Sequence, residues 1–166
     1  MLAAVYDGDA KKMAELIRQD PGFKVNMAVG GPGWTLLHFA CEVDSRSAVI
    51  PLLLAHPGIN VNARNKWGST PFSCTCANGH TSCVRELLKD SRVKVAEAYR
   101  DGTTPLFWAA FWGRLDVIKW WIASGREIDL GKPGDANTGA IEVAKMKPRS
   151  GDPAGEIQEG CRQDKE

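Results

Sequence analysis

The sequence predicts an all-α solenoid in which short antiparallel helix pairs stack one on the next. The first observation is a repeat: Gly33, Gly68 and Gly102, spaced 35 and 34 residues apart, are each followed by Thr and a short apolar stretch. The second is another apolar stretch later in every copy, such as "SAVIPLLLAHPG" and "LDVIKWWIASG". One helix pair cannot bury its apolar face alone, so the pairs are expected to stack.

The first helix of each unit is predicted from its start and stop signals. Thr70 can cap a helix because its hydroxyl accepts a hydrogen bond from an unpaired backbone N–H group. Pro71 follows directly, where its fixed φ suits the first helical turn and its missing N–H costs nothing. Gly79 can adopt the left-handed conformation that ends a helix. The next unit repeats this order 34 residues later, so both first helices are expected to be short.

The second helix of each unit is predicted from apolar spacing. In "CVRELL" the residues Cys83, Val84, Leu87 and Leu88 recur at helical spacing and define one apolar face. An extended linker rich in turn-forming residues follows each second helix, as in "INVNARNKW". The unit is therefore two helices followed by a hairpin-like loop.

These motifs resemble the ankyrin repeat, whose unit is a β-turn and two helices with a T-P-L-H-x-A core. The segments "GWTLLHFAC", "GSTPF", "CANGH", "GTTPLFWAA", "INVNA" and "LDVIKWWIASG" carry the resemblance. It implies one ankyrin-repeat domain over residues 1–166, with an N-terminal cap at 1–29, repeats at 30–64, 65–98 and 99–133, and a degenerate C-terminal repeat or tail at 134–166. Three positions depart from the family pattern: Leu36 replaces a proline, Asp44 a glycine and Gly139 a threonine.

Composition narrows the classes of partner. The chain of 166 residues holds 21 Lys and Arg against 20 Asp and Glu, and residues 65–133 hold ten against seven. Neither balance predicts binding to nucleic acid or to an anionic membrane. The longest apolar runs are too short to span a bilayer, and no signal peptide is recognised at the N-terminus. Five cysteines, an odd number, favour reduced thiols, so we expect an intracellular protein, cytoplasmic or nuclear.

Two cysteines and a histidine in "SCTCANGH" raise the question of a metal site. Cys74 and Cys76 are two residues apart on a helix, so they do not point the same way, and no second ligand pair has zinc-site spacing. Packing as small apolar groups is the favoured interpretation. His38 occupies the position whose family role is a structural hydrogen bond. With no nucleophile grouping and no phosphate-binding motif, the prediction is a protein that is not an enzyme and has no cofactor or metal.

The resemblance also implies where a partner binds, because the family uses the loop around each repeat glycine and the outer side of the first helix. The predicted partner-binding residues are Trp34, Glu42, Lys66, Trp67, Ser69, Asn78, Arg100, Asp101, Thr103, Phe111 and Trp112. Four of them are aromatic and two are basic, and Trp and Arg often dominate binding energy at interfaces. The open alternative is that these rings pack locally. Trp108 and Trp121 are expected in the core and Trp120 half-buried.

The predicted function is therefore a monomeric, non-catalytic module that binds another protein through the concave face of the stack. The alternatives are a scaffold or regulatory fragment of a larger multidomain ankyrin protein, or a module for a small ligand or nucleic acid. An enzyme would need a cluster of titrating groups in a pocket. The resemblance suggests one modification, hydroxylation of Asn62 in the inter-repeat hairpin by an oxygenase.

Overall fold

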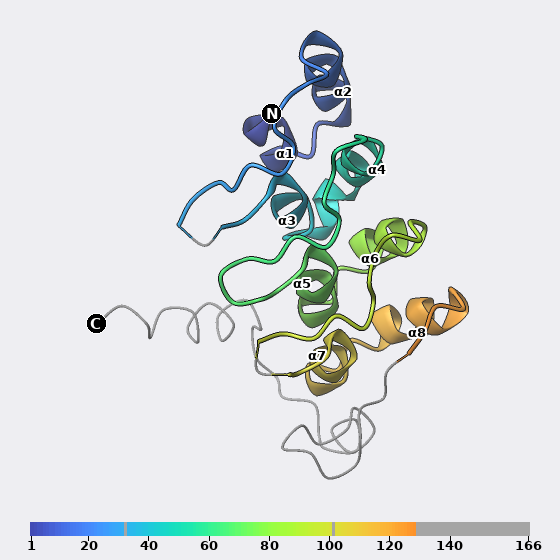
Figure 1. Ribbon diagram of the computed structural model, residues 1–166. Coiled ribbons are helices and arrows are strands. Elements are labelled where there is room, and N and C mark those ends of the chain that lie inside the picture. Colours follow the sequence, from blue (N-terminus) through green and yellow to red (C-terminus); the bar gives the residue numbers. More distant parts are fainter. Residues whose placement is uncertain (32, 101, 129–166) are drawn as a thin grey trace.

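The computed structural model describes residues 1–31, 33–100 and 102–128 (Figure 1). The helical elements in chain order are α1 (Leu2–Tyr6), α2 (Ala10–Gln19), α3 (Leu36–Ala40), the 3-10 helix η1 (Asp44–Val49), α4 (Ile50–Leu54), α5 (Pro71–Asn78), α6 (Thr81–Leu88), α7 (Pro105–Phe111) and α8 (Leu115–Ala123). Within these ranges there is no β-strand, and Val29 and Trp34 form one isolated bridge. The degenerate C-terminal repeat or tail expected at 134–166 lies outside the described residues.

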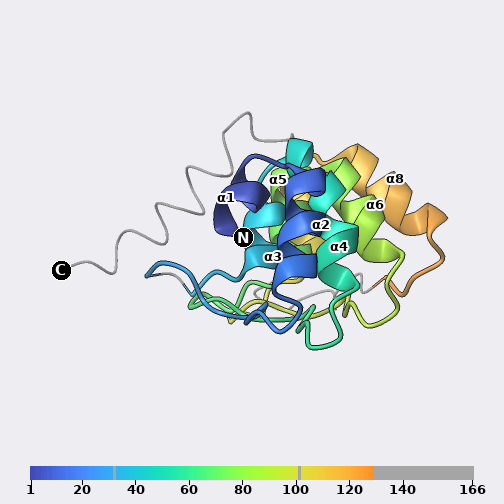
Figure 2. The ribbon, with the colours of Figure 1, turned by 90° about the horizontal axis from the view of Figure 1, so that it is seen from above.

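The helices form two layers, and the loops lie along one side of them. The first helices α1, α3, α5 and α7 stack in one layer, and the second helices α2, α4, α6 and α8 stack beside it (Figure 1). Seen from above, the long loops gather along one edge of the first-helix layer (Figure 2). The all-α solenoid of stacked helix pairs is therefore confirmed. None of the described helices has the length and apolar character needed to cross a membrane.

The ends of α5 are set by the residues that the sequence singled out. The Thr70 hydroxyl accepts from the Ser73 backbone nitrogen at 3.2 Å, and the Ser73 hydroxyl accepts from the Thr70 nitrogen at 2.8 Å. This reciprocal capping box pairs two backbone donors that a helix start leaves open. At the other end Gly79 has φ +81°, the left-handed conformation expected there.

The first repeat differs from the others at the turn between its helices. Asp44 stands where the other repeats have a glycine, and it begins η1 rather than a left-handed turn. The α-helical part of this second helix is therefore only Ile50–Leu54. The Asp44 carboxylate reaches forward to the next repeat, where it accepts from the backbone nitrogens of Ser82 at 2.7 Å and Cys83 at 3.3 Å.

The core is one continuous cluster between the two helix layers. Its largest fully buried side chains include Met13, Leu37, Phe72, Leu87 and Trp121. The Phe72 and Trp121 rings meet edge to face with centroids 5.0 Å apart, which joins two repeats. The core prediction for Trp121 is confirmed, whereas Trp120 is 42% exposed.

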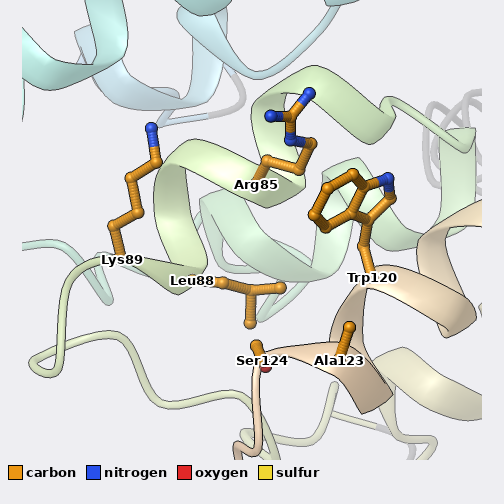
Figure 3. Close-up of a pocket in the computed structure, with 6 residues that line it drawn as sticks. All are labelled: Arg85, Leu88, Lys89, Trp120, Ala123 and Ser124. Atoms are coloured by element: carbon orange, nitrogen blue, oxygen red, sulfur yellow. The ribbon is translucent and has the colours of Figure 1, made fainter.

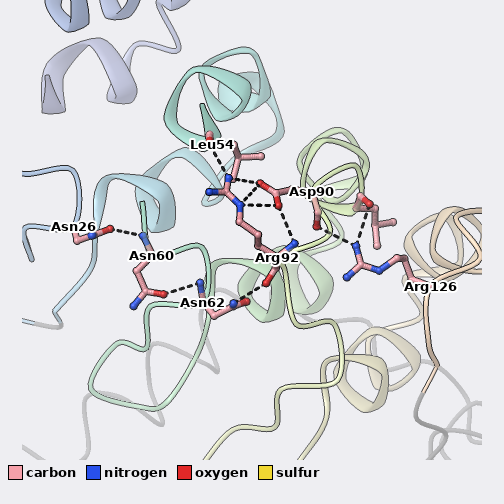
Figure 4. Close-up of polar contacts among 8 residues, drawn as sticks. Asn26, Leu54, Asn60, Asn62, Asp90, Arg92 and Arg126 are labelled. Carbon is pink, nitrogen blue, oxygen red and sulfur yellow. Dashed lines mark hydrogen bonds and ion pairs between the residues drawn. The ribbon is translucent and has the colours of Figure 1, made fainter. Parts of the chain in front are cut away.

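Two asparagines link successive hairpin loops in the same way (Figure 4). Asn26 donates through Nδ2 to the Gly58 carbonyl at 2.7 Å and accepts through Oδ1 from the Asn60 nitrogen at 2.7 Å. Asn62 makes the corresponding bonds to the Arg92 carbonyl and the Lys94 nitrogen, both at 2.8 Å. Each amide therefore pairs one donor and one acceptor of the next loop.

Two arginines, 34 residues apart, tie each second helix to the one before it (Figure 4). Arg92 donates to the Leu54 carbonyl at 2.7 Å, and Arg126 donates to the Leu88 carbonyl at 3.3 Å and the Asp90 carbonyl at 3.0 Å. Arg92 also binds the Asp90 carboxylate, and this hydrogen bond lowers the pKa of Asp90. The guanidinium groups satisfy carbonyls that the helix ends leave open.

Candidate partner-binding surface

The hairpin tip of the second repeat is built around Asn65. Its backbone nitrogen donates to the Ser69 carbonyl at 3.0 Å, and its carbonyl accepts from Gly68 at 3.0 Å. Its side-chain oxygen accepts from the backbone nitrogens of Trp67 and Ser69, both at 3.0 Å. These bonds set the position of Trp67 and draw Ser69 inward. In the third repeat the Tyr99 nitrogen donates to the Thr103 carbonyl at 2.9 Å and closes the same turn.

Successive hairpin tips are in direct contact at Gly68. A Cβ atom built on this glycine would lie 2.7 Å from Cγ of Arg100 and 3.1 Å from its backbone nitrogen. Gly68 also has φ +81°, a conformation that side chains disfavour. The contact places Arg100 against the turn that carries Lys66 and Trp67. Three of the predicted residues are therefore brought together.

Basic groups outnumber acidic groups on these loops. The Lys66 ammonium lies 4.8 Å from the centre of the Trp67 ring, and Arg100 is exposed. Arg64 pairs with Glu97 at 2.6 Å, and this hydrogen bond lowers the pKa of Glu97. The Arg64–Glu97 pair cancels in charge, and Lys66 and Arg100 then stand against Asp101, which lies outside the described residues, so a small positive surplus remains on these tips. Sequence reasoning missed Arg64, although its place two residues before Lys66 on the same loop was visible.

A cluster of aromatic rings lies next to the third hairpin. The Phe111 ring is partly buried and meets Phe107, Trp108 and Trp112 at centroid distances of 5.9, 5.6 and 5.1 Å. Trp108 donates from its indole nitrogen to the Thr103 hydroxyl at 2.8 Å. This bond holds the indole at the rim, so Trp108 is half-buried and its assignment to the core was wrong. Phe111 therefore packs against local rings while part of its surface stays exposed.

Two predicted residues are not available for contact. Trp112, the C-terminal cap of α7, is 4% exposed and its ring meets that of Phe111 edge to face. Ser69 is 3% exposed, and its backbone nitrogen donates to the Asn65 side chain. The expectation of exposed side chains at these two positions was wrong. Within the described part of the chain the indole nitrogen of Trp112 has no hydrogen-bond partner. Asp101 lies outside the described residues.

The predicted residues of the first repeat form a separate group. Trp34 is partly buried, and its ring contacts Phe39 at 5.2 Å and His38 at 6.1 Å. Glu42 binds Arg46 at 2.8 Å, and Arg46 in turn donates to backbone carbonyls and lies over the ring of Tyr6. Through Arg46, Glu42 thus helps to hold α3 against α1, while part of its own side chain stays exposed. Asn78, at the end of α5, is partly buried.

The titratable groups of the core are held in their neutral forms. His38 is fully buried, and its Nε2 atom lies 3.1 Å from the Ser69 carbonyl oxygen; burial lowers the pKa of His38 to about 4. Burial raises the pKa of the Cys41 and Cys76 thiols well above the usual value and that of Cys83 to about 12. The burial expected for Cys76 and Cys83 is confirmed, and Cys41 is buried as well. They lack the thiolate character of reactive cysteines.

Potential metal ligands lie apart from one another in the described ranges. There, no group of three or more His, Cys, Asp or Glu side chains is arranged to hold a metal ion. Cys74 is partly exposed and Cys76 is buried, so the pair noted in the sequence divides between surface and core.

The comparisons with known proteins agree with the repeat architecture. A family model described as ankyrin repeats, in three copies, matches residues 37–132. The human "SMC5-SMC6 complex localization factor protein 1" is 34% identical over 98 residues, which cover 59% of this chain and 9% of that protein. The rice "Probable E3 ubiquitin-protein ligase XBOS33" (Oryza sativa subsp. japonica) is 32% identical over 124 residues, 74% of this chain and 23% of that protein. The human "Ankyrin repeat domain-containing protein 63" is 35% identical over 78 residues, 47% of this chain and 20% of that protein. The chain thus spans less than a quarter of the length of each.

Proposed function

Because this chain belongs to the ankyrin-repeat family, whose repeats generally serve as protein–protein interaction modules, we propose that it binds a partner protein through its hairpin tips and first helices. The observation that carries the proposal is the contact between successive tips at Gly68. That contact joins the exposed cations Lys66 and Arg100 to the half-buried Trp67 ring in one patch. An apolar ring rimmed by charged groups is typical of a binding surface.

The charge of the patch indicates the chemistry of the partner. Lys66 and Arg100 favour a partner segment with carboxylates, and the flat Trp67 ring favours an apolar or planar group beside them. Phe111 and Thr103 extend the same surface toward α7, whereas Trp112 and Ser69 support it from below. Trp34 and Glu42 on the first repeat and Asn78 at the end of α5 form the edge of the proposed surface.

Affinity capture with matched variants tests the proposal. The double variant Trp67→Ala, Arg100→Glu removes the ring and reverses one charge without touching the core. The control Lys119→Glu reverses an exposed charge on α8, in the other helix layer. We expect at least one protein to bind the wild type and the control and to bind the double variant about 30-fold more weakly. Identical capture by all three proteins, with equal circular dichroism spectra, would reject the patch.

Relatives suggest a second candidate function at the level of the whole protein. The rice relative is named a probable ubiquitin-protein ligase, and it is more than four times as long as the matched segment. A chain of this family can therefore serve as the recognition part of a larger enzyme or scaffold. Sequencing of full-length transcripts that extend this reading frame would distinguish a separate module from a part of such a protein.

The modification of Asn62 is a proposal that rests on family resemblance alone. Its amide is held by the Arg92 carbonyl and the Lys94 nitrogen, so an oxygenase must first open the contact between the two loops. Peptide mass analysis of protein from its native cell tests the proposal. An oxygen adduct at Asn62 is the expected result, and its absence would remove the proposal.

A further inference from the structure

A pocket of about 310 Å³ lies between α6 and α8, in the second-helix layer (Figure 3). We name it the α6–α8 pocket. Its lining residues are Arg85, Leu88, Lys89, Trp120, Ala123 and Ser124. It is separate from the patch proposed above, which lies on the hairpin tips and first helices. Its volume is at the lower end of the range that binds small molecules or single side chains.

The pocket arises from the way the two helices pack. Arg85, Leu88 and Lys89 are at positions i, i+3 and i+4 along α6 and its C-terminal cap, so they form one stripe. Trp120, Ala123 and Ser124 have the same spacing along α8 and its C-terminal cap. The inward sides of both helices are fixed in the core by Leu87 and Trp121. The other members of the two stripes are exposed to solvent, and Leu88 is buried between the helices.

The electrostatics of the pocket favour an anionic group. The Arg85 guanidinium carbon lies 4.2 Å from the centre of the Trp120 ring, and no ion pair with Arg85 occurs within the described ranges. A guanidinium stacked on a ring keeps its N–H edge free to bind a carboxylate through two parallel hydrogen bonds. Lys89 is paired with Glu86 at 2.7 Å, and Glu86 is not among the lining residues. Arg85 is therefore the cation of the lining that can bind an added anion, and the lining itself carries no carboxylate.

The floor of the pocket favours an apolar group beside that anion. Leu88 is 9% exposed and points toward Ala123 and Ser124, and the Trp120 ring, 42% exposed, closes one side (Figure 3). The Ser124 hydroxyl donates to the Trp121 carbonyl at 2.6 Å, so it is already engaged. Most of the remaining pocket surface is hydrocarbon, so covering it with an apolar side chain of a partner lowers the free energy.

We propose that the α6–α8 pocket is a second binding site, which takes an acidic peptide segment of a partner protein with an aliphatic or aromatic side chain next to its Asp or Glu. The carboxylate binds the N–H edge of Arg85, and the apolar side chain lies over Leu88 against Trp120. Nucleic acid is disfavoured because Glu86 neutralises Lys89 and Asp116 neutralises Lys119, so among the described residues these neighbouring lysines do not extend a basic stripe from the pocket.

Titration with blocked hexapeptides, followed by the indole N–H resonance of Trp120, tests this site. The probe carries Leu and Phe flanked by Glu and Asp, and two controls replace the acids with Lys or the apolar residues with Ser. We expect only the acidic apolar probe to give a saturable shift, and Arg85→Glu to weaken its binding by about tenfold or more. The control Arg18→Glu, on an exposed site of α2, should bind like the wild type.

Three outcomes would overturn the proposal: no shift of the Trp120 resonance, equal shifts with the basic peptide, or unchanged affinity in Arg85→Glu. Trp120→Ala provides a second variant, whose binding is measured by titration calorimetry because the reporting indole is gone; it should abolish binding while the far-UV circular dichroism spectrum stays the same. Inorganic phosphate is added alone as a further probe; a saturating shift with phosphate at the peptide's concentration would assign the pocket to small anions instead. The Trp67→Ala, Arg100→Glu variant should bind the probe normally, so this site and the hairpin patch are tested independently.

Discussion

Asp44 of the first repeat caps α6 of the next: its Oδ1 atom lies 2.7 Å from the backbone nitrogen of Ser82, and its Oδ2 atom accepts from the Ser82 hydroxyl at 3.0 Å. A capping residue usually precedes its own helix in sequence, whereas this carboxylate is 38 residues away. It satisfies donors at the helix start and places negative charge at the positive end of the helix dipole. The substitution of the usual glycine thus adds a bond between repeats.

Removal of this cap should destabilise the stack. We expect Asp44→Ala to lower the free energy of unfolding by about 1–2 kcal/mol, since Ser82 and Cys83 lose their acceptor. Asp44→Asn should retain most of the stability because an amide oxygen also caps. Urea unfolding measures both, with Ser45→Ala as the control at the exposed neighbouring position. Equal stability of Asp44→Ala and wild type would show that the cap contributes nothing.

Loss of the Asn62 amide should have a comparable effect for a different reason. Asn62→Ala leaves the Arg92 carbonyl and the Lys94 nitrogen without their partner, so we expect a loss of about 1–2 kcal/mol in urea unfolding. Asn62→Asp keeps the acceptor for the Lys94 nitrogen but loses the donor to the Arg92 carbonyl. Its free energy of unfolding should therefore lie between those of the wild type and Asn62→Ala. Asn26→Ala removes an equivalent pair of bonds and should match Asn62→Ala. A variant as stable as the wild type at either position would contradict the role of these bonds.

Stability should fall in mild acid because of His38. Its folded-state pKa of about 4 lies below the ordinary 6.5, so between these values the unfolded chain takes up a proton that the folded chain does not. The resulting destabilisation is absent above pH 6.5 and grows as the pH falls. It is complete below about pH 4, where it lowers the free energy of unfolding by about 3 kcal/mol.

The variant His38→Gln isolates this effect. Glutamine at the third helical position can complete a capping box with Thr35 and does not titrate. Unfolding free energies at about pH 7 and about pH 5 should differ less in the variant than in the wild type. Burial also lowers the pKa of His80, but that contribution is common to both proteins and cancels. The same pH dependence in both would exclude His38 as its source.

Gly68 and Gly102 provide a matched pair for the contact between hairpin tips. Both have positive φ, +81° and +83°, so alanine at either position should cost about 1 kcal/mol from backbone conformation. Only at Gly68 would the new Cβ meet Arg100, at 2.7 Å, whereas a Cβ built on Gly102 has no atom of the described residues within 4 Å apart from its chain neighbours. We therefore expect Gly68→Ala to lower the melting temperature further than Gly102→Ala. Equal shifts would mean that the Arg100 side chain moves aside without cost.

The fold could be predicted from the sequence because its signals are local and repeated. Thr70, Pro71 and Gly79 determine the ends of α5 through their own backbone preferences, and the same order recurs one repeat later. The role of Asp44 could not be predicted in this way. Its partner Ser82 lies in another repeat, and only the stacked structure brings the two together.

Exposure at the candidate surface was harder to predict than the fold. Trp112 follows Phe111 at the end of a helix, where one residue of rotation decides which ring is covered, and Trp112 is the covered one. Trp108 was assigned inward from its repeat position, but the Thr103 hydroxyl holds its indole at the rim. Both outcomes depend on side-chain partners rather than on periodicity.

The buried thiols of Cys41, Cys76 and Cys83 have a practical consequence for dynamics. Each is inaccessible in the closed stack, and the three are distributed over α5, α6 and the end of α3. An alkylating reagent can modify them only while the surrounding helices are transiently separated. The rate at which each sulfur is labelled, resolved by peptide mass, would therefore report how often that part of the protein opens locally.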